Sequence, residues 1–131
     1  MADTVSSVKA FQSLGTGEYV YRYANRSDGT GESAVIKINV SDFTNAEGST
    51  ATSAKINRIE YDVSGFDYVH AYWDHTSDVT IAVLAGQGVR DFSYFGGFPD
   101  PGTGGTGDVT FTTNGGAAGS AYDITIYFEV K

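Results

Sequence analysis

The sequence has no cysteine, only two prolines and a single methionine, which is residue 1. Without cysteine the chain can form neither a disulfide framework nor a thiolate centre. Basic residues are scarce as well, since eight Lys and Arg face sixteen Asp and Glu, for a formal net charge of −8. A surface of that sign repels a phosphate backbone, so we expect no nucleic-acid partner. No apolar run reaches the length of a signal peptide or a membrane span, so we expect folding in a cytoplasm and no membrane.

What the chain does contain is glycine and aromatic side chains: 17 Gly, nine Tyr, eight Phe and one Trp among 131 residues. A chain of this length buries roughly two thirds of the surface that its unfolded form exposes, so a packed core is feasible. No break in composition resembles a linker. We therefore expect residues 1–131 to form a single domain, in which residues 1–14 are an arm or an edge strand.

The segment 55–84 has the most regular pattern in the chain. Apolar and polar residues alternate there with a period of two, which is typical of half-buried strands. Turn-forming residues interrupt the alternation at 64–67 and 74–78. The apolar positions are Ile59, Tyr61, Val63, Val69, Ala71, Trp73, Val79, Ile81 and Val83, while Tyr68, His70 and Tyr72 point the other way. The pattern predicts three antiparallel strands around the only Trp.

Similar segments elsewhere predict about eight strands, beginning near residues 5, 18, 34, 54, 67, 79, 109 and 120. In the third of these strands, Ile36, Ile38 and Val40 should face the core, with Lys37 outside. No stretch shows a sustained helical period with caps, so helix content should be negligible. The sequence therefore predicts an all-β, antiparallel β-sandwich of jelly-roll type.

A stripe of three tyrosines, Tyr19, Tyr21 and Tyr23, shares one face of the second predicted strand. Such a stripe is most often core packing. The alternative is an exposed contact surface, because tyrosine combines apolar area with a hydroxyl and is enriched at interfaces.

The segment 92–98 carries four aromatic side chains within seven residues, Phe92, Tyr94, Phe95 and Phe98, and lacks strand alternation. These rings either close one end of the sandwich as a lid or dock on another protein subunit. We predict the docking role for this segment and for the glycine-rich tip that follows it to Asp108, because exposed apolar clusters of this size are usually interaction sites.

Patterns for cofactors, metals and catalysis lack their required context. Residues 102–107 match G-x-G-x-x-G, but no strand precedes this motif and a β-patterned segment follows it, so a dinucleotide site is not expected. Asp74, His75 and Asp78 lie in a predicted turn, and His70 falls on the other sheet face from His75. No serine lies in a nucleophile-elbow pattern. We therefore expect no cofactor, no metal and no enzymatic activity.

Several short motifs resemble small virion proteins of tailed bacteriophages, mainly over residues 54–131. They are Arg58-Ile59-x-Tyr61-Asp62-Val63-Ser64-Gly65, Trp73-Asp74, Asp91-Phe92, Phe95-Gly96-Gly97, Thr106-Gly107-Asp108-Val109-x-Phe111-Thr112-Thr113 and Tyr122-x-Ile124. Some β-sandwich proteins of this kind are capsid decoration, or cement, proteins, which clamp neighbouring major capsid subunits.

The resemblance implies a non-enzymatic protein on the capsid surface of a virion assembled in a bacterial cytoplasm, with the major capsid protein and copies of itself as partners. A neck, tail or fibre-associated component is an alternative. A carbohydrate-binding module is another, in which Trp73 and the tyrosine stripe would stack on sugar rings. A sugar binder needs its aromatic rings exposed on one concave face, so the sugar alternative loses its best residue if Trp73 is fully buried.

Overall fold

A computed structural model describes residues 5–8, 18–100 and 105–131. For residues 5–8 and for Phe95 it describes the backbone only. The described chain is almost entirely β-structure. The strands are β1 (Val5–Val8), β2 (Glu18–Arg26), β3 (Val35–Ile38), β4 (Ala54–Ser64), β5 (Tyr68–His75), β6 (Val79–Leu84), β7 (Gln87–Asp91), β8 (Phe98–Pro99), β9 (Gly105–Asn114) and β10 (Ala121–Val130). Two 3-10 turns, η1 (Val40–Asp42) and η2 (Ser93–Phe95), complete the elements.

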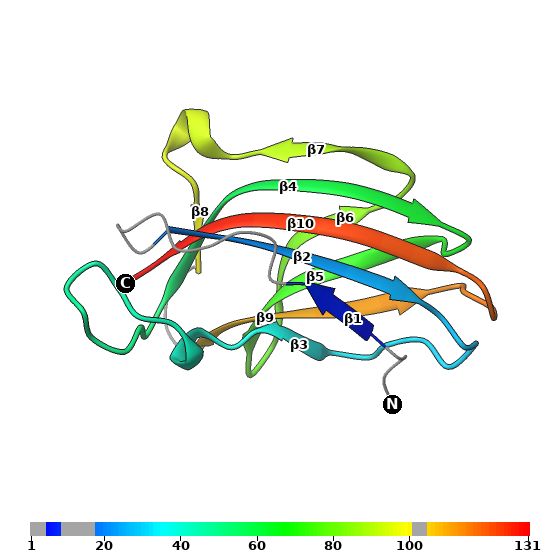
Figure 1. The fold of residues 1–131 in the computed structure, drawn as a ribbon, viewed down its shortest axis with the longest axis horizontal. Helices are drawn as coiled ribbons and strands as arrows, with labels where there is room; N and C mark the ends of the chain where they lie inside the picture. The colour runs from blue at the N-terminus through cyan, green and yellow to red at the C-terminus, as the bar shows by residue number, and fades with distance from the viewer. Residues whose placement is uncertain (1–4, 9–17, 101–104) are drawn as a thin grey trace.

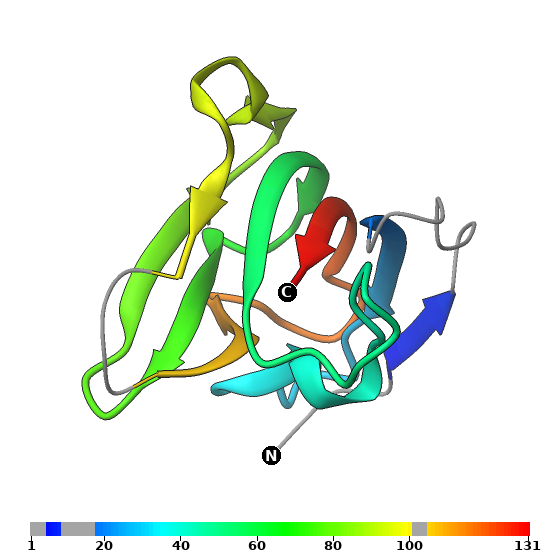
Figure 2. The same cartoon turned by 90° about the vertical axis from the view of Figure 1, so that its left-hand side faces the viewer.

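The strands form two antiparallel sheets that pack face to face. One sheet has the order β1-β2-β10-β4-β7 with β8 also paired to β4, and the other has the order β3-β9-β5-β6. Figure 1 looks onto the six-stranded sheet, and Figure 2 shows the two layers from one end. The predicted antiparallel sandwich of jelly-roll type is therefore confirmed, and among the described residues there is no helix that could span a membrane.

The core lies between the sheets and takes every second residue of the long strands. In β10, Tyr122, Ile124, Ile126, Phe128 and Val130 are buried and alternate with half-buried residues, as the period of two predicts. From the opposite sheet, Val69, Ala71, Trp73, Val109 and Phe111 are fully buried. The alternation along the central strands therefore correctly predicts which of their side chains are buried in the core.

Alternation fails in β3, where the prediction for Ile36 and Lys37 is wrong. The register between β3 and β9 shifts between Ile36 and Ile38, so one extra residue occupies β3. Such a bulge rotates the strand by one position. As a result Ile36 is 50% exposed, Ile38 is buried, and the Lys37 side chain points into the sandwich.

The buried lysine is paired with a carboxylate and lies near two aromatic rings. Lys37 Nζ lies 2.6 Å from Glu32 Oε2, and both side chains are buried. The hydroxyl of Tyr122 donates to the other carboxylate oxygen of Glu32 at 2.5 Å. The ammonium also lies 5.8 Å from the ring centroid of Phe111 and 5.7 Å from that of Tyr122. A charge in this position needs such partners, because an unpaired buried charge is strongly destabilising.

Alternation also fails in β6, for the same reason. The register between β5 and β6 shifts at Ala71/Tyr72, which leaves Ile81 as the extra residue. Ile81 and Ala82 are both buried, and Val83, predicted to face the core, is 42% exposed.

In the predicted loop 85–108, the described residues 85–100 and 105–108 contain more strand than the sequence predicts. The predicted loop contains strands β7 and β8, both paired with β4, and β9 begins at Gly105 instead of residue 109. Short strands without alternation leave no clear signal in a single sequence. These added strands matter because they hold the aromatic segment 92–98 at one end of the sandwich.

Candidate functional site

The predicted contact segment 92–98 divides into rings that face the body and a ring that faces outward. Phe92 and Phe98 are half-buried, pack against the core and lie 5.4 Å apart in an edge-to-face contact. Phe98 also meets Trp73 edge-on at 6.2 Å. Tyr94, in contrast, is 83% exposed. Two rings of the segment therefore act as a lid on the core, while Tyr94 remains exposed and is the part that could contact another subunit. The side chain of Phe95 lies outside the described part.

The turn that carries Tyr94 is fixed at its base. The backbone N–H and the hydroxyl of Ser93 donate to Asp91 Oδ1 at 2.9 and 2.5 Å, and these bonds lower the pKa of Asp91. Gly96 ends the turn with a φ of 90°, a left-handed conformation that glycine adopts without strain. The N–H of Phe92 donates to the carbonyl of Asn57 at 2.8 Å. Tyr94 is thus presented on a pre-organised support, which lowers the entropy cost of a contact.

The residues considered for a metal site serve other purposes in the structure. His75 pairs with Asp100 through Nε2, and both side chains are nearly buried. The pair ties the end of β5 to the segment after β8. His70 bonds the hydroxyls of Thr80 and Tyr72 at 2.9 and 3.0 Å. Within the described ranges, no three His, Cys, Asp or Glu residues lie close enough to hold a metal ion. Residues 102–104 of the glycine motif lie outside these ranges.

The tyrosine stripe of β2 faces the interior. The rings of Tyr19 and Tyr21 lie 4.8 and 5.2 Å from Phe43 and are half-buried. Tyr23 is 3% exposed and donates to the carbonyl of Lys37 at 3.0 Å. Burial raises the pKa of the Tyr23 and Tyr21 hydroxyls. Tyr23 is therefore withdrawn from the predicted contact residues, because its ring does not reach the surface.

Trp73 is fully buried in the core, with 0% of its surface exposed. A sugar-binding tryptophan must offer a ring face to the ligand. The carbohydrate alternative therefore loses the best of the residues that the sequence offered for it.

A surface that the sequence analysis did not single out lies on the outside of the β3-β9-β5-β6 sheet, and we call it the four-stranded face. Its outward side chains include Ile36, Tyr68, His70, Tyr72, Thr80 and Val83. Cross-strand pairing places Ile36, Thr110, Tyr72 and Thr80 in one row, and Thr112, His70 and Val83 in the next. The rings of His70 and Tyr72 stack at 4.0 Å with an interplanar angle of 14°.

This face is almost without ionic groups. The four strands of its sheet contain three Asp, Glu, Lys or Arg residues: Lys37, whose side chain is buried, Asp74 and Asp108. The alternation of Tyr68, His70 and Tyr72 was visible in the sequence. What could not be read there is which neighbouring strands continue the surface and how little charge they add.

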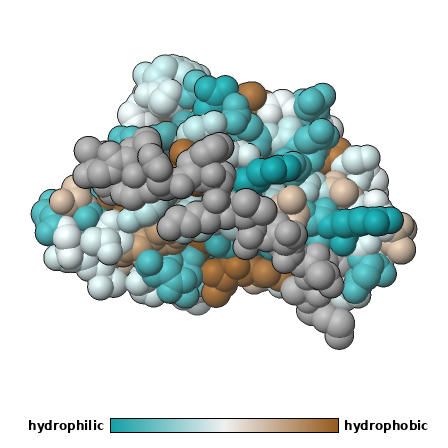
Figure 3. Space-filling model, viewed as in Figure 1, coloured by the Kyte–Doolittle hydropathy of each residue, from teal (hydrophilic) through white to brown (hydrophobic). Residues whose placement is uncertain are grey.

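The outer face of the six-stranded sheet has the opposite character, and we call it the ionic face. Its strands contain Glu18, Arg22, Arg26, Lys55, Arg58, Glu60, Asp62, Arg90, Asp91, Asp123 and Glu129. Three ion pairs join members of this set: Arg22 with Asp123, Arg58 with Glu60, and Lys55 with Glu129. Figure 3 shows hydrophilic side chains spread over this side of the molecule.

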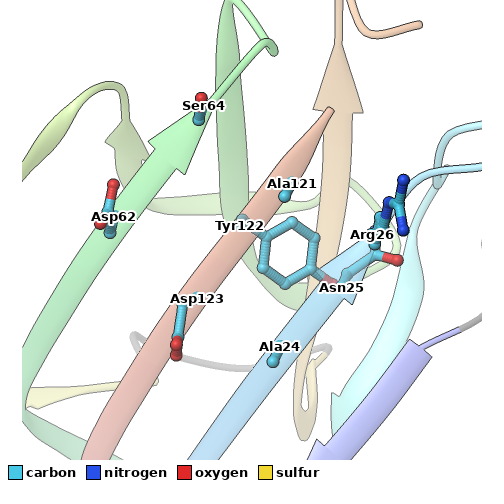
Figure 4. A pocket seen from close by; sticks show the side chains of 8 residues that line it. All are labelled: Ala24, Asn25, Arg26, Asp62, Ser64, Ala121, Tyr122 and Asp123. Atoms are coloured by element: carbon cyan, nitrogen blue, oxygen red, sulfur yellow. The ribbon is translucent and has the colours of Figure 1, made fainter. Parts of the chain in front are cut away.

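The ionic face is hollowed at one end. A cavity of about 380 Å³ is lined by Ala24, Asn25, Arg26, Asp62, Ser64, Ala121, Tyr122 and Asp123. Figure 4 shows that these residues come from the neighbouring strands β2, β10 and β4. Two alanines in adjacent strands leave the depression, because their side chains are shorter than the charged residues around them.

Comparison with known proteins gives a fold and no family. No family model and no curated protein sequence matches the chain. Among solved structures, a mutant of the carbohydrate-binding module CBM29-2 complexed with mannohexaose is similar with a TM-score of 0.50 and 9% identity, over 99% of this chain and 93% of that chain. A second CBM29-2 mutant is similar with a TM-score of 0.50 and 8% identity, over 96% of this chain and 85% of that chain.

A further similar structure is HppE, as its Co(II) form in complex with Tris buffer. The identity is 11% and the TM-score 0.46, and the chain spans 55% of the length of that protein. At these identities the likeness concerns the β-sandwich fold alone.

Proposed function

We propose that the chain is a non-enzymatic structural protein of a tailed-phage particle, a capsid decoration protein that docks on neighbouring major capsid subunits through its four-stranded face. The observation that carries the proposal is the scarcity of charge on that face in a chain of net charge −8. The centres of protein interfaces are depleted in charged residues and enriched in tyrosine.

The composition of the four-stranded face fits a protein partner in more detail. Ile36 and Val83, 50% and 42% exposed, supply apolar area on opposite edge strands. Tyr72 and His70 between them supply rings with fixed orientations, because His70 is bonded to Thr80 and to Tyr72. Side chains held in one conformation lose little entropy on binding.

The remaining surface suits a protein that coats a particle. The charged side chains of the ionic face, several of them in ion pairs, keep the outward side of the coat in water. A decoration protein needs no catalysis, since many weak contacts add up when many copies bind one shell. The resemblance of residues 54–131 to phage virion proteins supports the same role.

The proposal is tested with two valine variants that differ in the face they change. Val83→Lys places a charge on the four-stranded face, and Val89→Lys places one on the equally exposed edge strand β7 of the other sheet. We expect Val83→Lys to lower occupancy on purified particles at least about 10-fold, as for a residue at an interface centre. Val89→Lys should bind as the unmodified chain does. Equal occupancy for the two variants, with equal melting temperatures, would contradict docking through this face.

Carbohydrate binding at the same face is a second candidate, favoured by the row of rings Tyr68, His70 and Tyr72 beside the Thr80 hydroxyl. The fold is shared with CBM29-2, whose structure holds mannohexaose. Against a sugar ligand, the stacked His70 and Tyr72 rings cover one face of each other. Migration through gels that contain soluble mannans or glucans separates the candidates. Retardation that Tyr72→Ala abolishes would favour the glycan over the capsid subunit.

A further inference from the structure

We propose that Tyr94 of one copy inserts into the alanine-floored hollow on the ionic face of a second copy, which joins neighbouring copies side by side. This lateral contact is distinct from docking on the shell, because it uses neither the residues nor the surface of the four-stranded face. It begins from two independent features, an aromatic ring held out in solvent and a cavity of about 380 Å³.

The hollow has the chemistry that a phenol side chain needs. Ala24 and Ala121 give an apolar floor, on which one face of the ring can lie. The Arg26 guanidinium at the rim can pack on the opposite ring face, as cations do with tyrosine. The carboxylates of Asp62 and Asp123 can accept the phenol O–H in a charge-assisted hydrogen bond. The volume falls within the range of about 300–1,000 Å³ for clefts that hold small organic groups.

The rim residues have binding capacity that the described chain does not use. No side-chain hydrogen bond or ion pair joins Arg26 or Asp62 to any other residue of the described ranges. Asp62 and Asp123 lie directly opposite each other on paired strands, an arrangement that is unfavourable for two like charges. Arg22 compensates one of these carboxylates. A donor from outside would bind the second.

The tyrosine and the hollow cannot meet within one copy. The turn that carries Tyr94 is bonded to Asn57 of β4, whereas the hollow lies beside Asp62 and Ser64 of the same strand. Five to seven residues of strand separate them, which is roughly 16–23 Å. In Figure 1 the turn between β7 and β8 lies at the upper left of the molecule, and the end of β2 and the start of β10 lie at the right. A Tyr94 ring that enters the hollow must therefore come from another copy.

The ring and the hollow are different surfaces, so the contact can be repeated head to tail or exchanged symmetrically between two copies. Two copies can exchange tyrosines and close as a pair, or each can bind the next in a chain. One ring in one hollow buries little area, so the isolated protein should associate weakly. On a particle, where copies are held close together by the shell, a weak lateral contact is sufficient.

Two variants and their mixture test the contact by sedimentation velocity at protein concentrations up to about 1 mM, where weak association is still visible. Tyr94→Ser removes the ring. Ala24→Phe introduces a side chain that fills the hollow of its own copy. We expect the unmodified chain to associate and each variant to do so at least about 10-fold more weakly. Because one variant keeps the hollow and the other keeps the ring, their equimolar mixture should form 1:1 complexes and nothing larger.

Each outcome decides the proposal. Unmodified protein that remains monomeric over the whole range, a variant that associates as well as the unmodified chain, or a mixture that remains monomeric would overturn it. Val83→Lys serves as the control, because a charge on the four-stranded face should leave self-association unchanged. That control also separates the two proposals, since particle docking can fail while self-association persists, and the reverse.

Discussion

The two sheets are alike where they face each other and different where they face outward. Both inner faces contribute fully buried aliphatic and aromatic residues to one core. On the outside, one sheet carries ion pairs between adjacent strands, while the other presents Tyr68, His70 and Tyr72 flanked by Ile36 and Val83. Folding requires the two inner faces to be alike, because any sandwich needs two apolar faces around its core. Folding does not require the two outer faces to differ. We therefore assign function to the outer face that lacks charge.

The largest expected loss of stability comes from breaking the buried ion pair of Lys37 and Glu32, compared with an exposed ion pair of the ionic face. Lys37→Met leaves Glu32 buried with the hydroxyl of Tyr122 as its remaining partner. We expect a loss of about 3–5 kcal/mol in the free energy of unfolding, as for one partner of a buried pair. Chemical denaturation measures the loss. Arg22→Met breaks an exposed pair on the ionic face and should change stability far less. Similar losses in the two variants would mean that Lys37 is not buried.

Next in size is a test of the inner faces, with adjacent residues of β10 that point in opposite directions. Ile126→Ala removes a fully buried side chain and should cost about 2–5 kcal/mol through lost transfer energy and the cavity left behind. Thr125→Ala, on the ionic face, should stay within about 0.5 kcal/mol. Denaturation curves of the two variants give both numbers. A loss below about 1 kcal/mol for Ile126→Ala would reverse the assignment of the faces.

Alkaline pH probes the buried tyrosine of β2. Burial raises the pKa of the Tyr23 hydroxyl well above its usual value. Because the folded pKa exceeds the unfolded one, its contribution to stability is constant below about pH 10 and falls as the pH rises further, by up to roughly 1.4 kcal/mol per unit. Tyr23→Phe should reduce that slope in denaturation experiments between about pH 9 and 11. An unchanged slope would show that Tyr23 ionises in the folded protein.

The smallest effect concerns an exposed pair of the ionic face under acid conditions. The hydrogen bond from Arg22 lowers the pKa of Asp123. A carboxyl group whose folded pKa is depressed stabilises the protein above its unfolded pKa of about 4, and that contribution disappears as the pH falls through the folded value. Solvent screens the pair, so the change should be small. Thermal melting between pH 2 and about pH 6 should be slightly less pH-dependent in Arg22→Met, and a steeper dependence would contradict the assignment.

The sequence predicts the fold well wherever strands are long and regular. In β4, β5 and β10 the period of two identifies the core side chains, because a strand paired on both sides keeps its register. The errors at Ile36, Lys37 and Val83 have one cause. Each lies at or beside a bulge in an edge strand, and a bulge depends on the partner strand as well as on the local sequence. Single-sequence periodicity contains no information about the partner.

The candidate surfaces were less predictable than the core. The aromatic content of segment 92–98 was evident, but strands β7 and β8 decide which rings turn inward and leave Tyr94 outside. The tyrosine stripe of β2 and the row at Tyr68, His70 and Tyr72 have the same spacing in the sequence. Only sheet pairing distinguishes them, since the first lies inside the sandwich and the second outside.

The most direct test of the proposed function is electron cryo-microscopy of phage particles prepared with the chain, at a resolution that traces its strands. The account predicts density for this sandwich on the capsid surface, with the β3-β9-β5-β6 sheet toward the major capsid subunits and the ionic face toward solvent or toward Tyr94 of neighbouring copies. A sandwich seated on the shell by its six-stranded sheet would contradict docking through the four-stranded face. Density for the sandwich at the neck, tail or fibres would mean that its partner is another virion protein and not the major capsid protein.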